Sequence, residues 1–309
     1  MALYNYLKNF FTRNGVFLSV FLLGVVGFWI FFLIILPQIF MFDFSFRFNL
    51  PPAEQGGPND VYTISHYKFL LFGSALSEDS YNVIDLTVFL RTIVTAVFVT
   101  LFDFIICYPI AYYLAQVAKG GWARLMVLSL IVPFWVNEIL RAFAFRIIFG
   151  SNGVINDALM AMGIVDDPYP FIRENIALYA GLGYAFVLLM IFPLYNAVES
   201  LDKNQIEAAR DLGSPWWRIH WRVVMPFAKP GISSGCTMVF MLSAGALAAP
   251  QILGGPSSLW FTQIIYQWFN TGGNWPRGSA YAIVLLITSI VFVLLVMKIF
   301  KVKLGEIAR

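Results

Sequence analysis

The sequence predicts an all-α, polytopic membrane protein with six transmembrane helices. Hydrophobic residues make up 60% of its 309 residues and charged residues 12%, about half the charged share that is usual in water-soluble domains. The mean hydropathy is +0.76. Several apolar runs reach roughly 20 residues, which is enough for a helix to cross the hydrocarbon core of a bilayer. These observations exclude a soluble globular domain.

The six expected helices form a single transmembrane domain over residues 1–309. The first apolar run follows Lys8 and Arg13 and is too long for the apolar core of a cleaved signal peptide. We therefore expect this helix to be retained, with Met1 as the start of the mature chain. Several runs exceed the length that a bilayer requires, which allows the helices to tilt. The expected spans are residues 16–41, 86–117, 122–149, 175–198, 231–253 and 278–300.

The distribution of basic residues predicts that both termini face the cytoplasm, because Lys and Arg gather in the cytoplasmic segments of membrane proteins. With a cytoplasmic N-terminus, thirteen basic residues fall on the cytoplasmic side and four on the opposite side. The cytoplasmic set is Lys8, Arg13, Lys119, Arg124, Lys203, Arg210, Arg218, Arg222, Lys229, Lys298, Lys301, Lys303 and Arg309. The opposite set is Arg47, Lys68, Arg173 and Arg277. Residues 42–85 are then external, and residues 199–230 form a cytoplasmic loop.

The external segment is acidic, and its charge has two interpretations. It could be a solvated loop whose few basic residues reflect its side of the membrane. It could also be a surface that attracts a cationic solute or the carrier of that solute. Its acidic residues are Asp43, Glu54, Asp60, Glu78, Asp79 and Asp85.

Several kinds of chemistry have no support in the sequence. The net charge of +3 is small and scattered, so we expect no nucleic-acid partner. There is no HExxH motif, and His66 and His220 are expected on opposite sides of the membrane, so we expect neither a metal site nor catalytic residues. Cys107 and Cys236 both lie in apolar runs, where a disulfide framework is not expected.

The cytoplasmic loop contains the polar stretch EAARDLGSPWWRIHWRVVMP, residues 207–226. Asp202 and Gln205 have the spacing of a capping box and predict the start of a helix. Gly213 can adopt the left-handed conformation that closes it. A second helix is then expected, capped by Ser214 and ended by Pro226, with its tryptophans and arginines at the membrane interface.

The spacing within this loop resembles the EAA loop of binding-protein-dependent ABC importer permeases. The matching residues are Glu207-Ala208-Ala209, then Gly213 after three residues, Val223 after nine more, and Met225-Pro226, where Met225 replaces the usual Leu. The resemblance implies the type I, MetI-like permease fold. It also implies that the loop helix seats in a groove of a separate ATPase subunit. Residue types fit this role, because Ala208 and Ala209 allow close approach and Glu207, Arg210 and Asp211 can pair with polar groups at the rim.

Other stretches resemble the spermidine/putrescine permeases in particular, and most closely the first of two non-identical subunits. These stretches are residues 130–168, the segment LDKNQIEAARDLG, and residues 252–283. The resemblance implies a bacterial inner-membrane importer with a second permease, two ATPase subunits, an external solute-binding protein and surrounding lipid. Its substrate would be a small organic cation, most naturally a polyamine. Another small amine or an amino-acid derivative remains an alternative.

No Walker A pattern occurs, because neither Gly120-Gly121 nor Gly254-Gly255 is followed by Gly-Lys-Ser/Thr. ATP and Mg²⁺ are therefore expected in the partner ATPase subunits, with no cofactor in this chain. An ion-gradient-driven transporter is a second alternative, but the paired broken helices and internal symmetry typical of that class are not evident. An intramembrane enzyme would need a nucleophile–base or metal constellation, and the spans contain none.

Two acidic residues, Asp103 and Glu138, fall inside the expected spans, where charges usually mark a pathway. Glu138 lies near Trp135, Asn137 and Arg141. Glu138 and Arg141 are three apart and could simply neutralise each other. Alternatively, either carboxylate could lie along the route of an amine, with Trp135 offering a cation–π face. Tyr184 could add a further stacking surface.

Overall fold

The computed structural model describes residues 11–12, 15–51, 53–54, 56–58, 60–73, 81–255 and 258–302, except for the side chains of residues 123, 124 and 133. Within these ranges the chain is helical, and its one β-bridge, between Arg47 and Tyr62, is isolated. Four helices of the described ranges are long and apolar enough to cross a membrane. Some residues used in the topology prediction lie outside the described residues: Met1, Lys8, Arg13, Glu78, Asp79, Lys303, Arg309 and the Arg124 side chain.

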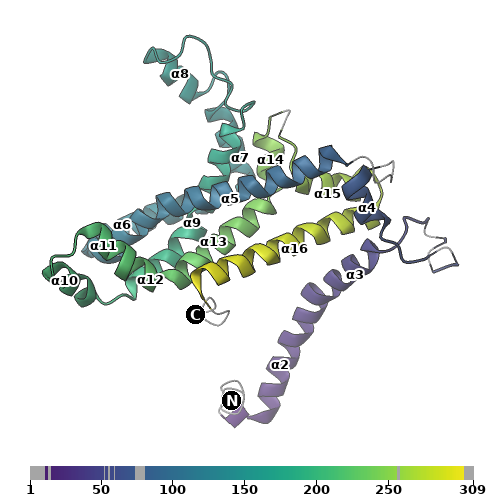
Figure 1. Ribbon diagram of the computed structural model, residues 1–309, viewed down its shortest axis with the longest axis horizontal. Helices are drawn as coiled ribbons and strands as arrows, with labels where there is room; N and C mark the ends of the chain where they lie inside the picture. Colours follow the sequence, from purple (N-terminus) through teal and green to yellow (C-terminus); the bar gives the residue numbers. More distant parts are fainter. Residues whose placement is uncertain are drawn as a thin grey trace.

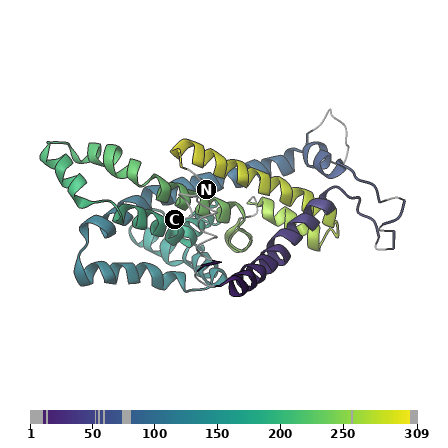
Figure 2. The same ribbon diagram turned by 90° about the horizontal axis from the view of Figure 1, so that it is seen from below.

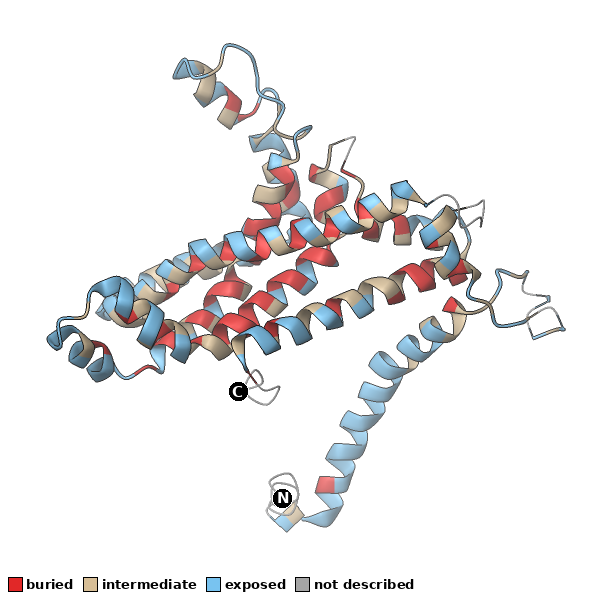
Figure 3. Cartoon of the chain, viewed as in Figure 1, coloured by how far each residue is buried: buried red, intermediate tan, exposed pale blue. Residues whose placement is uncertain are grey.

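The first of these long helices, Val16–Ser45, stands apart from the rest of the chain along most of its length (Figure 1). It consists of α2 (Val16–Ile30), a π-helical turn η1 (Phe31–Ile35) and α3 (Leu36–Ser45). Only α3 packs against the bundle, on α16 (Trp275–Phe300). Figure 3 shows α2 as almost entirely exposed, whereas α3 becomes partly buried toward its C-terminal end. A helix that is apolar on every side suits contact with lipid or with another subunit.

The centre of the molecule is a bundle of three helices that pack against one another in pairs: α5 (Val83–Tyr112), α9 (Ile176–Glu199) and α13 (Lys229–Ala244). α5 continues through a π-helical turn, η3 (Tyr113–Val117), and α16 covers another side of α13. Close approach of α13 to α9 requires a glycine, because a Cβ at Gly231 would overlap the backbone oxygen of Pro193 in α9. Phe240 and Phe292 stack at 3.5 Å and join α13 to α16.

Two of the expected continuous spans are interrupted in the structure. The expected span 122–149 is divided into α6 (Gly120–Phe134) and α7 (Glu138–Ile148). The break is stabilised locally, since Asn137 Oδ1 accepts a hydrogen bond of 2.9 Å from the Ile139 amide at the start of α7. An N-cap of this kind supplies a partner that an uncapped helix start lacks.

The expected span 231–253 is likewise divided, into α13 and α14 (Ala248–Leu253). Gly245 ends α13 with a hydrogen bond from its amide to Met241 O, and the Ala246 carbonyl accepts a hydrogen bond of 2.6 Å from Thr262 Oγ1. Thr262 thereby satisfies a backbone group that the interruption leaves free. The two outer pieces, α7 and α14, pack together and leave the direction of the bundle (Figure 1).

The connecting helices gather at two ends of the bundle. α10 (Lys203–Asp211), α11 (Trp216–Ile219), the π-helical turn η4 (His220–Val224) and α12 (Met225–Phe227) lie at one end. α4 (Ser65–Phe72) and α15 (Phe261–Asn270) lie at the other, and α8 (Val154–Ala161) extends beyond α7 (Figures 1 and 2). The cytoplasmic loop and the external segment of the topology prediction are therefore at opposite ends.

Candidate functional site

The first helix of the cytoplasmic loop, α10, begins and ends as its sequence predicts. Asp202 is its N-cap and accepts a hydrogen bond of 3.0 Å from the Asn204 amide. At the other end the Ser214 amide donates to Ala209 O (3.1 Å) and the Gly213 amide donates to Arg210 O (2.9 Å). This pair of bonds is a Schellman motif, which needs a left-handed residue after the helix. Gly213 supplies it with a φ of 75°.

The two faces of α10 differ sharply. Ile206 is only 6% exposed and belongs to the same core cluster as Ile219 of α11. The opposite face is open, and Leu212, just after the helix, is 86% exposed. Leu212 is thus an apolar side chain on a face that the described part of the chain leaves uncovered. This surface, called the coupling surface below, consists of Glu207, Ala208, Asp211 and Leu212.

The second helix differs from its prediction at both ends. Pro215, rather than Ser214, is the residue before the helix, and no side chain caps it. Pro226 does not end the helix, which runs from Trp216 through η4 to Phe227. The π-helical turn η4 ends at Val224, so Pro226 lies in the first turn of α12. A proline is tolerated there because the backbone amide that it lacks would have no partner within the helix. Trp216, Trp217 and Trp221 are exposed, as expected of interfacial residues.

Four residues of this region make contacts that the sequence did not predict: Tyr108, Tyr112 and Gln116 of the α5–η3 helix, and His220 of η4. The Tyr108 Oη atom lies 2.8 Å from His220 Nδ1. Gln116 Nε2 donates to Val198 O at 2.7 Å. The only sequence signal was the spacing of four between the three α5–η3 residues, which places them on one helix face.

Of the predicted pathway residues, Asp103 is buried and Glu138 is exposed. Asp103 is fully buried on α5, and neither of its carboxylate oxygens has a hydrogen-bond partner among the described residues. It faces Gly183 of α9, where a Cβ would lie 3.1 Å from Asp103 Oδ1. The structure therefore places these two carboxylates in different environments, one enclosed within the bundle and one exposed.

The proposed neutralising pair of Glu138 and Arg141 is also not formed within the described residues, whose ion pairs both involve Arg47. Arg141 instead donates to the Ala185 carbonyl of α9 at 3.4 Å and lies over the Phe134 ring. Trp135, in the break between α6 and α7, is 85% exposed. Irregular backbone at membrane depth occurs where protein or a water-filled cavity covers it.

Tyr184 of α9 is 41% exposed and stands near the same group of residues. Its ring lies 5.2 Å from the ring of Phe145 in α7. Asn137 is the N-cap of α7. Some of the predicted residues near the break therefore stabilise the helices there, and others are exposed. The carboxylate of Glu138 is the exposed charge among them.

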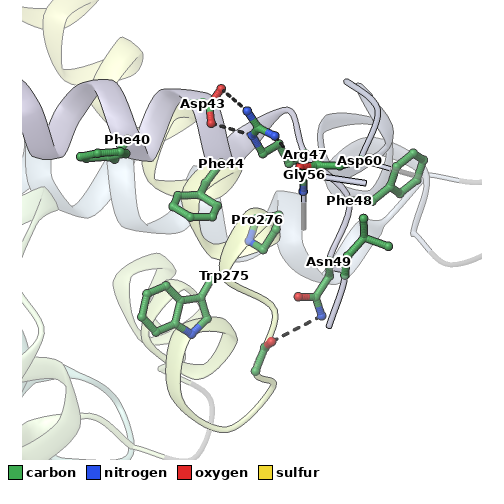
Figure 4. A pocket seen from close by; sticks show the side chains of 12 residues that line it. Phe40, Asp43, Phe44, Arg47, Phe48, Asn49, Gly56, Asp60, Trp275 and Pro276 are labelled. Carbon is green, nitrogen blue, oxygen red and sulfur yellow. Dashed lines mark hydrogen bonds and ion pairs between the residues drawn. The ribbon is translucent and has the colours of Figure 1, made fainter. Parts of the chain in front are cut away.

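At the external end, Arg47 neutralises two of the acidic residues (Figure 4). It contacts Asp43 and Asp60, each at 2.6 Å. The Asp43 carboxylate raises the pKa of the Arg47 guanidinium. These residues border a cavity of about 610 Å³ together with Phe40 and Trp275. The contacts tie Asp60 to the end of α3, and they favour a structural role for this part of the acidic segment.

Comparison with known families decides the class of protein. Residues 107–302, more than half of the chain, match the family described as "Binding-protein-dependent transport system inner membrane component". The chain belongs to this family. The match includes the whole cytoplasmic loop with its EAA spacing and begins in α5.

Individual relatives agree with the family assignment. The spermidine/putrescine transport system permease protein PotB of Salmonella typhimurium (strain SL1344) is 30% identical over 88% of this chain and 89% of that protein. PotB of Escherichia coli (strain K12) is 30% identical over 85% of this chain and 90% of that protein. The inner membrane ABC transporter permease protein YdcU of the same organism is 28% identical over 67% of this chain and 69% of that protein.

The fold is shared with solved importers at lower identity. A bacterial ABC transporter involved in the import of alginate matches with a TM-score of 0.70 at 16% identity, covering 96% of this chain and 98% of that one. The MetNI methionine transporter matches with a TM-score of 0.53 at 18% identity, covering 70% of this chain and 94% of that one. This inner membrane component is thus a multi-pass permease subunit of an ABC importer. It is a translocation component, and partner ATPases hydrolyse the ATP.

Proposed function

We propose that this permease subunit forms part of the route by which a polyamine crosses the inner membrane. The observation that carries the proposal is the 30% identity to PotB over 88% of the chain, with 89% of that protein covered. A different small amine or an amino-acid derivative is the alternative, because the name of the relative YdcU specifies no substrate.

The coupling surface is the proposed contact with an ATPase subunit. Glu207 and Asp211 lie four apart on one face of α10, Ala208 allows close approach, and Leu212 is an apolar anchor. Arg210 is also exposed and Ala209 is half-buried at the edge of this surface. ATP and Mg²⁺ would be bound by the ATPase subunits, and both termini of this chain would face them from the cytoplasm.

The pathway residues are proposed to guide the amine through the membrane. Glu138 and Trp135 offer a carboxylate and an aromatic face beside each other at the helix break, which suits an organic cation. Asn137, Arg141 and Tyr184 border this position. Asp103 would reach the solute only when α5 and α9 separate, because it is closed off between them in this structure. A second permease subunit and an external solute-binding protein would complete the route.

Reconstitution tests the proposal. The chain would be expressed with its accompanying permease, ATPase and solute-binding protein, and the purified assembly placed in vesicles with ATP inside. We expect uptake of radiolabelled spermidine that stops without ATP and persists when the proton gradient is collapsed. Uptake of an amino-acid derivative but not spermidine would favour the alternative substrate. Uptake that follows the proton gradient and ignores ATP would contradict the assignment.

A further inference from the structure

Three side chains lie on one face at the cytoplasmic end of the α5–η3 helix. Tyr108, Tyr112 and Gln116 follow at intervals of four, the spacing that aligns residues along a helix. Two of them belong to the last turns of α5, and Gln116 belongs to η3. All three contact the cytoplasmic loop, but at different points along it.

Gln116 holds the beginning of the loop. Its Nε2 donates to Val198 O at 2.7 Å and to Leu201 O at 3.3 Å. The first carbonyl lies at the C-terminal end of α9, and the second belongs to Leu201, two residues before α10 begins. Val198 O also accepts a hydrogen bond of 3.2 Å from the Leu201 amide, so Gln116 adds a side-chain bond to a backbone turn that is already closed.

His220 holds the second half of the loop. Its Nδ1 lies 2.8 Å from the Tyr108 Oη atom, and its ring meets the edge of Tyr112 at 4.4 Å between centroids. Trp216 packs on another side of the imidazole at 5.4 Å. Arg210 of α10 borders the small cavity beside these rings. Burial lowers the pKa of His220, which favours the neutral imidazole that can accept a hydrogen bond from the Tyr108 hydroxyl.

Both holding points adjoin π-helical turns. His220 is the first residue of η4, and Gln116 lies within η3. Such turns interrupt the regular helical bonding and are common at functional positions. Between the two holding points, Ile206 and Ile219 bury α10 and α11 against the same core. α10 therefore cannot shift far without carrying the end of the α5–η3 helix.

The α5–η3 helix also reaches the external end. The span Val83–Val117 has 35 residues, about 50 Å of helix. Near its outer end, Asp85 accepts a hydrogen bond of 2.6 Å from the Tyr281 hydroxyl of α16. About two turns further in, Thr92 Oγ1 accepts a hydrogen bond of 3.0 Å from the Phe261 amide of α15. This single helix thus connects the loop to α15 and α16.

We infer that α5, rather than α13 alone, carries the movement of the coupling surface across the membrane, with Tyr108, Tyr112, Gln116 and His220 as its positioning residues. The inference rests on the proposed contact of this surface with an ATPase. The sequence alone directs attention to the fifth span, because that span follows the loop directly. The contacts show that the α5–η3 helix holds the loop at two points, Leu201 and His220.

The test uses the full reconstituted assembly and measures spermidine taken up per ATP hydrolysed. Tyr108→Phe removes only one oxygen atom, and Gln116→Leu removes the two bonds to the start of the loop. We expect each to lower this ratio about fivefold, the factor that the loss of one hydrogen bond gives. ATPase subunits should still co-purify in wild-type amounts. Tyr113→Phe and Gln251→Leu are matched controls, since neither side chain has a hydrogen bond within the described structure and both should keep the wild-type ratio.

A conservative replacement separates positioning from mere packing. His220→Asn keeps an acceptor where Nδ1 lies and should retain most of the ratio, whereas His220→Leu should lose it. A second readout needs no transported substrate. Spin labels would be attached at two exposed positions, Ile84 of α5 and Val154 of α8, and the change in the distance between them would be measured on addition of ATP and vanadate. Tyr108→Phe should diminish this change.

The outcomes are distinguishable. If the wild-type assembly showed ATP-driven movement but no spermidine uptake, the polyamine proposal would fail and the spin-label test of α5 would still stand. If Tyr108→Phe, Gln116→Leu and His220→Leu all kept the wild-type ratio and the wild-type distance change, the role of α5 would be refuted. If His220→Asn behaved like His220→Leu, His220 would not act through this hydrogen bond.

Discussion

Asp103 and Glu138 illustrate how differently one chain can place two carboxylates within the expected spans. Asp103 is enclosed between α5 and α9 with no hydrogen-bond partner in the described chain. A buried carboxyl group without a partner is costly in its charged form. Glu138 is exposed at the start of α7, beside Trp135. The first is suited to a step that opens the bundle, and the second to initial contact with a cation.

Substitution of these carboxylates tests their role. We expect Glu138→Gln and Asp103→Asn each to lower spermidine uptake about tenfold, equivalent to the loss of about 1.4 kcal/mol of attraction. Asp157→Asn, on the exposed surface of α8, is the control and should leave uptake unchanged. Uptake would be compared at equal amounts of protein in the membrane. Unchanged uptake in both single variants and in the double variant would remove the carboxylates from the pathway.

His220 gives the loop a defined response to pH. Burial lowers the pKa of His220 in the folded protein, so the folded state favours the neutral imidazole. The contribution of this neutral imidazole to the stability of the fold is fully present above about pH 6.5, the ordinary pKa of histidine. This stability is lost as the pH falls through the lowered pKa. The groups around the imidazole are Tyr108, Tyr112, Trp216 and Arg210, none of which is an acid that would stabilise the charged form.

We therefore expect uptake per ATP to be constant from about pH 8 to pH 6.5 and to fall below that range in the wild type. The His220→Asn variant should show a flatter profile, because its amide does not titrate. Parallel profiles for the two proteins would show that another group controls the response.

At the scale of elements, α10 depends on the conformation of one residue. Gly213 has a φ of 75°, and a Cβ there would meet no atom within 4 Å. A side chain at this position would thus be opposed by the backbone conformation alone, at a cost of about 1–2 kcal/mol. Gly231 of α13 is the reverse case, because the backbone of Pro193 in α9 leaves no space for a Cβ there.

This contrast predicts a graded series at Gly213. Gly213→Asn should bind the ATPase nearly as well as the wild type, since Asn tolerates the left-handed region. Gly213→Val should weaken that binding about tenfold, measured by titrating purified ATPase against the permease in detergent. Equal affinity for both variants would mean that the Schellman turn does not shape the coupling surface.

Local signals explain which elements were predictable. The bounds of α10 follow from Asp202 and Gly213, residues that act on neighbouring amides and carbonyls. The break in the fifth span was not predictable, because its free carbonyl at Ala246 is satisfied by Thr262, sixteen residues away. Hydropathy registers both halves of such a span as one apolar run. The Tyr108–His220 contact joins residues 112 apart and depends on tertiary packing.

At the scale of the whole molecule, the described part of the chain leaves several surfaces that the bundle does not cover. Three of them are the helix Val16–Ser45, the break between α6 and α7, and the coupling surface. The first two are apolar or lie within the expected membrane region, and the third is polar and cytoplasmic by the distribution of basic residues. This division fits a subunit that meets lipid and a second permease on its sides and an ATPase at one end.

The contact between α10 and a separate ATPase is the central claim, and affinity purification of the intact assembly tests it most directly. The tagged permease would be purified in mild detergent, as wild type and as Glu207→Lys, and the co-purified ATPase quantified. We predict a stoichiometric ATPase with the wild type and at least about a tenfold loss with Glu207→Lys, because the reversal replaces an attraction with a repulsion. Lys203→Glu, at the first turn of α10 and outside the coupling surface, should retain the ATPase. Full retention of the ATPase by Glu207→Lys, together with unimpaired ATP-driven uptake, would contradict the account.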